Sequence, residues 1–292
     1  MKEAFVYKNF SQNNIDKIAL VNSILDEYNA QGFDLSLRQL YYQLVARGYI
    51  ENSTQSYKKL GSLVNNARLA GEVDWNMIVD RSRSQVINQH WDNPGQIVAA
   101  AAYSFKVDKW ENQPVHLEVM VEKDALSCVL EPVTQRQDIY FTANKGYPSA
   151  SLLYRMSKRL QRYLDDGKSV YILHLGDHDP SGIDMTRDLA DRLGLFTGLP
   201  VTIQRLALNI DQVEQYNPPE NPAKLSDTRA SVYVAEYGYS SWELDALEPR
   251  VLAALVDNFV NEHRDETLWQ ETLDREAEMS QTLHEFAGRW ED

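Results

Sequence analysis

Three acidic residues directly follow two apolar segments of the sequence. Glu122 follows Val115–Val121, and Asp177 and Asp179 follow Ser169–Leu175. If both segments are strands of one parallel sheet, their carboxyl ends meet at the edge where such sheets bind ligands. Residues two apart in an extended segment project to the same side, so the two aspartates can reach one point. No lysine-rich segment accompanies them, so their repulsion favours a bound cation, and carboxylate oxygens favour Mg²⁺ or Mn²⁺.

A simpler interpretation of the same acidic residues stays open. Asp179 precedes Pro180, and an aspartate N-cap with proline at the first helical position is a common start of a helix. In this interpretation Asp177 caps a turn. His174 and His178 lie four residues apart, but on a strand and a loop rather than on one helical face, which argues against a histidine metal site.

Strands and helices alternate in the middle of the chain. The predicted strands are Val115–Val121, Asp138–Thr142, Ser169–Leu175 and Val201–Leu208. The predicted helices between them are Ala125–Leu130, Ser149–Leu164 and Gly182–Leu193. This alternation is typical of the α/β class with a parallel sheet. Further helices are predicted at Pro249–His263 and Glu266–Trp290.

The first 110 residues have a different pattern. Three helices are predicted, at Asn14–Ala30, Leu37–Arg47 with Ser36 as its N-cap, and Thr54–Ala70, before a short extended segment at Trp75–Asp80. Helices followed by a short strand pair outline a winged-helix domain. We therefore expect three parts: a winged-helix domain in residues 1–110, an α/β domain in 111–210, and an acidic, mostly helical extension in 211–292.

Three motifs in order resemble the Toprim domain of the type IIB topoisomerase (topoisomerase VI) A subunit and of the related meiotic double-strand-break transesterase. They are VEKDA at Val121–Ala125, TANKGYPS at Thr142–Ser149 with Arg155 beyond it, and GDHDPSGID at Gly176–Asp184. The resemblance implies that Glu122, Asp177 and Asp179 bind Mg²⁺, or Mn²⁺. A weaker similarity follows at Trp242–Pro249, WELDALEP.

The same family implies a catalytic tyrosine, the second in an Arg-x-x-Tyr-Tyr motif. Here the motif is Arg38-Gln39-Leu40-Tyr41-Tyr42. Helical spacing places Tyr41 on the apolar face with the leucines, and Arg38 beside Tyr42 on another face. We therefore expect an exposed Tyr42 phenol whose guanidinium neighbour binds phosphate and favours the phenolate. The alternative is that both tyrosines belong to an amphipathic core helix.

Charge is distributed unevenly along the chain. The formal net charge is −14, of which the segment 211–292 carries −13, so residues 1–210 are nearly neutral and can present local basic faces. Candidate contacts to the DNA backbone are Lys145, Arg155, Lys158 and Arg159, with a merely solvated helix face as the alternative.

These features together predict a DNA-cleaving enzyme. The expected reaction is Mg²⁺-dependent transesterification, in which the Tyr42 phenolate attacks a backbone phosphorus of double-stranded DNA and leaves a covalent phosphotyrosyl link and a free 3′ hydroxyl. The resemblance implies a homodimer in which Tyr42 works against the metal site of the other subunit, so that two such sites produce a staggered double-strand break. No nucleotide-binding loop is recognisable in the sequence, and the resemblance implies that ATP is used by a separate B-type subunit. One cysteine, no signal-like start and no apolar run of about 18 residues favour a cytoplasmic protein without a membrane partner. Hydrolysis by a Toprim nuclease and non-catalytic DNA binding are the alternatives.

Overall fold

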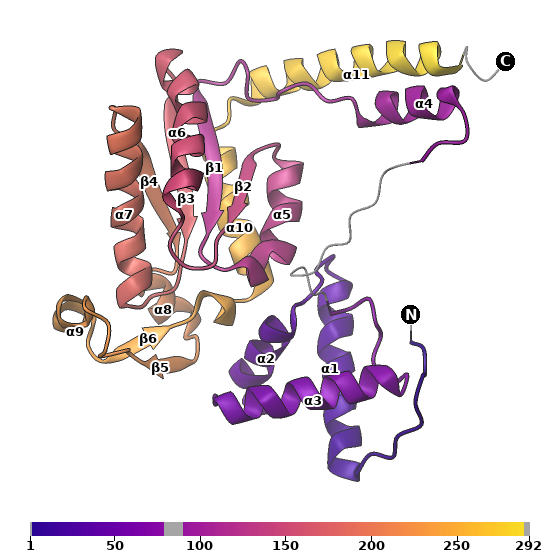
Figure 1. The fold of residues 1–292 in the computed structure, drawn as a ribbon, viewed down its shortest axis with the longest axis vertical. Helices are drawn as coiled ribbons and strands as arrows, with labels where there is room; N and C mark the ends of the chain where they lie inside the picture. The colour runs from indigo at the N-terminus through magenta and orange to yellow at the C-terminus, as the bar shows by residue number, and fades with distance from the viewer. Residues whose placement is uncertain (1, 79–89, 289–292) are drawn as a thin grey trace.

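A four-stranded parallel sheet forms the centre of the molecule in the computed structural model, which describes residues 2–78 and 90–288 (Figure 1). The strand order is β2-β1-β3-β4. The strands are β1 (Val115–Val121), β2 (Tyr140–Ala143), β3 (Ser169–Leu175) and β4 (Thr202–Ala207). The predicted α/β class is confirmed, and the bounds of β1 and β3 agree with the prediction. β2 begins two residues later than expected, because Asp138 adopts a positive φ and turns the chain.

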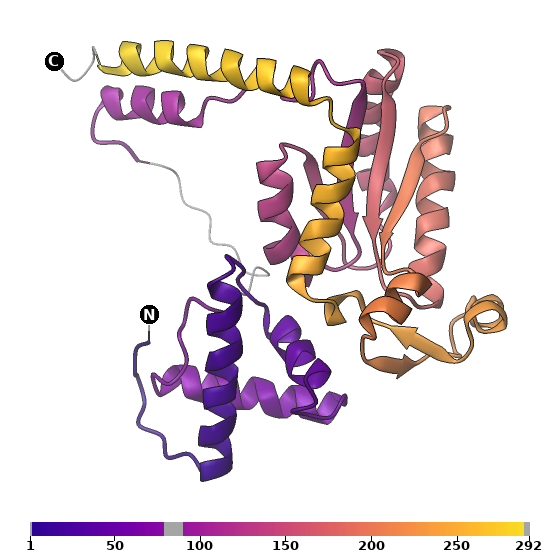
Figure 2. The same cartoon turned by 180° about the vertical axis from the view of Figure 1, so that it is seen from behind.

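Helices cover both faces of this sheet (Figures 1 and 2). Leu117, Val119 and Val121 of β1 pack with α5 (Ser127–Arg136) and α10 (Pro249–His263). Met120 faces the other way and packs with α6 (Ala150–Asp165) and α7 (Pro180–Thr197). All seven residues of β1 are buried, which explains why a mainly apolar segment, interrupted by His116 and Glu118, predicted it.

The N-terminal region is a compact group of three helices. They are α1 (Gln12–Asn29), α2 (Leu37–Ala46) and α3 (Thr54–Leu69), close to their predicted bounds. Ser36 caps α2 as expected, in a capping box with Gln39. The extended segment expected at Trp75–Asp80 forms no strand as far as Ile78, which makes a single bridge with Leu35. Its last two residues lie outside the described part, so the strand pair of a winged helix is not observed within residues 2–78.

The C-terminal third is not a separate unit. α10 belongs to the core of the sheet, and Trp269 at the start of α11 (Glu266–Gly288) is buried in the same core. The rest of α11 extends beside α4 (Pro94–Ser104) (Figures 1 and 2). The helix expected at Glu266–Trp290 is present as far as Gly288, and its last two residues lie outside the described part. The remaining elements are α8 (Ile210–Tyr216), α9 (Ala230–Tyr237), and the antiparallel pair β5 (Glu220–Pro222) and β6 (Ser240–Trp242).

The segment after β6 joins the two halves of the molecule. A short 3-10 helix, Leu244–Ala246, contacts α2. Ala246 is buried in the core of the N-terminal helices, whereas Leu244 and Leu247 are buried in the core of the sheet. This segment therefore holds α2 against the carboxyl ends of β1 and β3. None of the described helices is long and apolar enough to span a bilayer.

Candidate active site

Lys123 lies at the centre of a buried group of charges at the carboxyl end of β1. Its Nζ lies 2.7 Å from Asp177 Oδ1 and 2.7 Å from Asp245 Oδ1, and it also pairs with Glu243. The lysine side chain is only 15% exposed. The sequence interpretation expected a bound cation among strand-end carboxylates. The structure supplies a cation from the protein itself, one residue after Glu122.

Asp177, Glu243 and Asp245, here called the carboxylate cluster, present oxygens that all lie within 4.8 Å of one another. Asp177 Oδ1 also accepts a hydrogen bond from the Leu244 N–H at 2.8 Å, which fixes the 3-10 helix against the strand end. Burial raises the pKa of Asp177 despite the nearby Lys123 ammonium. Burial also acts to raise the pKa of Glu243, but Lys123 and Arg38 outweigh it and hold that pKa below its ordinary value.

Arg38 connects the carboxylate cluster to Tyr42. Its guanidinium lies 2.7 Å from Glu243 Oε2 and 2.5 Å from Asp245 Oδ2. The same guanidinium carbon lies 5.9 Å from the centre of the Tyr42 ring. The predicted i, i+4 proximity of Arg38 and Tyr42 is therefore confirmed, but the arginine is engaged by two carboxylates.

The expected difference in exposure between the two tyrosines is wrong. Tyr41 is 5% exposed and Tyr42 is 6% exposed. The reason is that α2 is covered on two sides, by α1 and α3 and by the segment around Ala246. Burial, with Glu243 and Asp245, raises the pKa of Tyr42 above its ordinary value, against the opposing effect of Arg38. The expected net preference for phenolate is thus reversed in this state.

The hydroxyl groups still distinguish the two tyrosines. Tyr41 donates to Asn52 Oδ1 at 3.0 Å and accepts the Ser53 N–H at 2.8 Å, so its hydroxyl is bound on both sides. The Tyr42 hydroxyl makes no hydrogen bond within the described residues. Tyr42 lines a cavity of about 330 Å³ together with Arg38 and Glu243. Of these two tyrosines, Tyr42 is therefore the one whose hydroxyl is unengaged among the described residues.

Of the three predicted metal ligands, only Asp177 belongs to the carboxylate cluster. Glu122 is buried behind it, where Oε2 accepts the Asp177 N–H at 3.0 Å and burial raises the pKa of the carboxyl group. Asp179 is the N-cap of α7, and its Oδ1 accepts the Gly182 N–H at 2.6 Å. The simpler interpretation of Asp179 is thereby confirmed.

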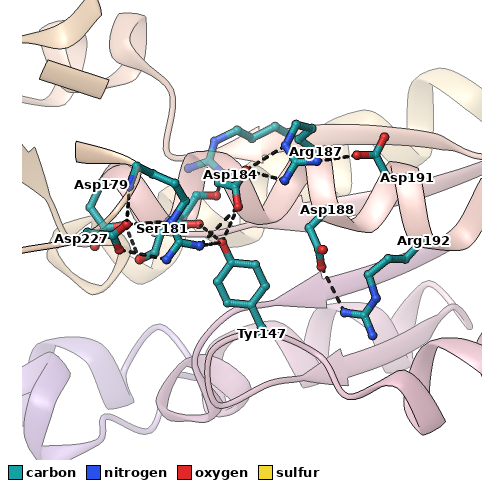
Figure 3. Close-up of polar contacts among 12 residues, drawn as sticks. Tyr147, Asp179, Ser181, Asp184, Arg187, Asp188, Asp191, Arg192 and Asp227 are labelled. Carbon is teal, nitrogen blue, oxygen red and sulfur yellow. Dashed lines mark hydrogen bonds and ion pairs between the residues drawn. The ribbon is translucent and has the colours of Figure 1, made fainter. Parts of the chain in front are cut away.

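The loop that carries TANKGYPS is bonded to the start of α7 (Figure 3). The Tyr147 hydroxyl donates to Asp184 Oδ2 at 2.7 Å and also bonds Arg229. Asp184 in turn pairs with Arg187 at 2.7 Å. These contacts position the turn from Asp177 into α7. The two histidines of the region do not converge: His174 bonds Thr186, whereas His178 bonds Tyr233.

The candidate DNA contacts have different surroundings. Lys145 is exposed and 3.9 Å from Asp124, and Arg155 and Lys158 are exposed on α6. Arg159 is engaged inside the protein, because its Nε and Nη2 donate to the two oxygens of buried Glu118, each at 2.7 Å. This pairing with Glu118 contradicts the expectation that Arg159 contacts the DNA backbone.

The donor chemistry of the carboxylate cluster fits a divalent metal. Three carboxylates suit Mg²⁺ or Mn²⁺, which prefer hard oxygen ligands. The Lys123 Nζ occupies the space among those oxygens, so a metal there requires Lys123 to move away. Three negative and two positive groups, Lys123 and Arg38, leave the ionised site one negative charge in excess.

Lys123, Glu243 and Asp245 were not chosen from the sequence as site residues. Their signals were present, because Lys123 lies within VEKDA and the two acids lie within WELDALEP. No protein-family model, curated protein or solved structure matches this chain. The resemblance to the type IIB A subunits therefore continues to rest on the motifs alone.

Proposed function

We propose that this chain cleaves double-stranded DNA by transesterification, with Tyr42 as the nucleophile and Mg²⁺ or Mn²⁺ held by the carboxylate cluster. The observation that carries the proposal is the position of Arg38, which contacts the Tyr42 ring and pairs with Glu243 and Asp245. The candidate nucleophile, Arg38 and one carboxylate of the cluster, Glu243, thus line one cavity. In this proposal the N-terminal helices are a reduced winged-helix domain, and the sheet is a Toprim domain.

The proposed reaction exchanges one phosphodiester for another. The Tyr42 oxygen attacks the phosphorus, the bond from phosphorus to the 3′ oxygen breaks, and that oxygen leaves with a proton as a free hydroxyl. Glu243 lines the same cavity and is placed to accept the phenol proton; its lowered pKa keeps it ionised but also makes it a weaker base. A divalent ion, when bound, supplies compensation for charge on the attacked phosphate.

Entry of DNA also explains how the buried site becomes active. A phosphate offers Arg38 and Lys123 a new anionic partner, in competition with the carboxylates they now bind. Release of Lys123 opens the space among Asp177, Glu243 and Asp245. In the state described here the raised pKa of Tyr42 keeps the phenol protonated, which protects the nucleophile until substrate arrives.

A homodimer with a staggered pair of cleavage sites belongs to this proposal, as does a separate ATPase subunit as a partner. The expected arrangement, with Tyr42 working against the partner's metal site, is not required by the geometry. Tyr42 already lies beside carboxylates of its own chain, through Arg38.

The test is to trap the covalent product. The protein is incubated with supercoiled DNA and Mg²⁺ or Mn²⁺, quenched with detergent, and analysed for protein attached to DNA ends. We expect adducts from the wild type and from Tyr41→Phe, and none from Tyr42→Phe. Adducts that persist in Tyr42→Phe but disappear in Tyr41→Phe would overturn the assignment of the nucleophile.

Hydrolysis of DNA without a covalent link is the second candidate. It is favoured by one observation, the burial and raised pKa of Tyr42. In that case Tyr42→Phe cleaves as well as the wild type, no adduct forms, and cleavage still depends on Asp177. A protein that only binds DNA would give neither adducts nor cleavage in the same assay.

A further inference from the structure

A large groove lies on the N-terminal helices, outside the candidate active site. Its volume is about 800 Å³, and it is formed by the segment before α1, by α1, by the turn after α2, and by α3. Four lysines line it: Lys8, Lys17, Lys58 and Lys59. Glu51 is the one acidic residue of the lining. In a chain with a net charge of −14, this excess of positive charge is a local feature.

The lysines of the groove are available for a ligand. Lys17, Lys58 and Lys59 are exposed, and none of them makes an ion pair within residues 2–78 and 90–288. Lys8 donates to Asn66 Oδ1 at 2.6 Å, so its charge is held in place without being neutralised. This contrasts with Arg38, Lys123 and Arg159, which are all paired with carboxylates.

The composition of α3 extends the same property along a helix. Its sixteen residues, Thr54–Leu69, include no aspartate or glutamate. Toward the groove α3 presents hydroxyl and amide side chains, among them Gln55, Ser56 and Asn66, beside its two lysines. Lysines with amides and hydroxyls are the groups that bind the phosphate oxygens of a nucleic acid backbone.

The first turns of α3 also connect the groove to Tyr42. Thr54 and Tyr57 line the cavity that contains Tyr42, whereas Gln55 and Lys58 line the groove. The groove and the Tyr42 cavity are therefore lined by neighbouring residues of the first turns of α3.

We propose that this groove binds the phosphate backbone of double-stranded DNA and holds the duplex against Tyr42. The inference rests on the proposed function for its choice of ligand. It differs from the sequence expectation, which placed DNA on Lys145, Arg155, Lys158 and Arg159. Binding to the DNA backbone releases condensed counterions, so the affinity falls steeply as the salt concentration rises. Each phosphate contact contributes about −0.9 to the slope of log K against log salt concentration.

The test measures binding of the full-length protein to a labelled duplex across a salt series, with EDTA present so that no cleavage occurs. For Lys58→Glu/Lys59→Glu we expect at least about a tenfold loss of affinity and a salt slope reduced in magnitude by about 2. Lys58→Arg/Lys59→Arg should bind as the wild type does. Lys145→Glu/Lys158→Glu carries the same change in charge on the face expected from the sequence, and we expect it to lower the affinity less than the groove variant does; an equal or larger loss would place DNA on that face instead.

Several outcomes would overturn the groove. One such outcome is that Lys58→Glu/Lys59→Glu binds the duplex with the same affinity and the same salt slope as the wild type. Another is that the protein binds an RNA duplex selectively over the DNA duplex. If the double reversal lowers the melting temperature, Lys17→Glu on α1 tests the same groove from its opposite wall. Groove-dependent binding without adducts in the trapping assay would count against the proposed function alone. Adducts together with unchanged binding in the groove variants would count against the groove alone.

Discussion

The Lys123 ammonium lies 2.7 Å from Asp177 Oδ1, so a lysine two residues beyond the end of one strand neutralises a carboxylate that follows another. Asp245 and Glu243 share the same ammonium. The protein thus places its own cation among oxygens that otherwise suit a divalent metal, and the two cations must compete for the site.

Lys123→Met tests this competition. Removal of one partner of a buried ion pair costs about 3–5 kcal/mol, because the carboxylates remain buried without their counterion. We expect the variant to be less stable than the wild type in EDTA. Mg²⁺ should restore part of the loss, since saturation at a hundred times the dissociation constant adds about 2.7 kcal/mol. Thermal unfolding and calorimetric titration with Mg²⁺ measure both effects.

Lys145→Met is the matched control for that experiment, because the Lys145 side chain is 77% exposed. It should change neither the stability nor the response to Mg²⁺. If Lys123→Met binds Mg²⁺ no better than the wild type does, the carboxylate cluster is not a metal site.

The two tyrosines of α2 should differ in stability as well as in chemistry. Tyr41→Phe removes the acceptor of the Ser53 N–H and the donor to Asn52, and should cost about 1–2 kcal/mol. Tyr42→Phe breaks no hydrogen bond among the described residues and should change the free energy of unfolding by no more than about 0.5 kcal/mol. Denaturant unfolding of both variants decides this, and a larger loss in Tyr42→Phe would reveal a hidden partner of its hydroxyl.

Parts of this arrangement were accessible from the sequence because they depend on neighbouring residues. β1 is buried on both faces, so its sequence is mainly apolar from end to end, and this pattern predicted the correct bounds of the strand. The Asp179–Pro180 pair predicted a helix start, and the structure has one there. The cap on α2 was likewise predicted from Ser36.

Other parts depend on residues that are distant in the chain. The helical pattern of α2 identified one apolar face, but its other side is covered by the segment around Ala246, some two hundred residues later. The exposure of Tyr42 was therefore not predictable from α2 alone. From its residue type, Arg159 was expected on the surface. Its pairing with Glu118, forty-one residues earlier in the chain, follows only from the fold. The same holds for Glu243 and Asp245. They pair with Lys123 only because the fold places the segment after β6 at the carboxyl end of β1.

The stability of the protein should depend on His174 at acidic pH. Burial, with a smaller effect of Arg205, lowers the pKa of His174 from 6.5 to about 3. The unfolded chain therefore binds a proton below pH 6.5 that the folded chain does not bind. The contribution of neutral, buried His174 to the free energy of unfolding is fully present above pH 6.5. It is lost as the pH falls toward about 3, by up to about 1.4 kcal/mol per pH unit.

His174→Asn removes this titration and can still bond Thr186, so its unfolding free energy should fall less steeply with acid than that of the wild type. The same change at His284, an exposed residue of α11, is the control and should leave the slope unchanged. Equal slopes in the wild type and in His174→Asn would show that the histidine is protonated in the folded protein.

Gly182 should be indispensable at the turn from Asp177 into α7. A Cβ at this position would lie 2.2 Å from the Asp177 backbone oxygen, which Arg205 Nη2 also binds at 2.6 Å. Because the obstructing atom is backbone, Gly182→Ala must displace the residue that carries the central carboxylate of the site. Overpacking of this kind costs about 1–3 kcal/mol. The displacement should also abolish cleavage, since Asp177 would leave Lys123 and the carboxylate cluster.

Gly194→Ala provides the comparison within the same helix. Its Cβ would have no neighbour closer than 3.9 Å, so alanine should stabilise α7 by about 0.5–1 kcal/mol through its higher helix propensity. Thermal unfolding of both variants, together with the adduct assay, separates a general effect of alanine in α7 from the local one at the turn. Unimpaired stability and cleavage in Gly182→Ala would mean that the close approach of α7 to Asp177 is not needed to position the site.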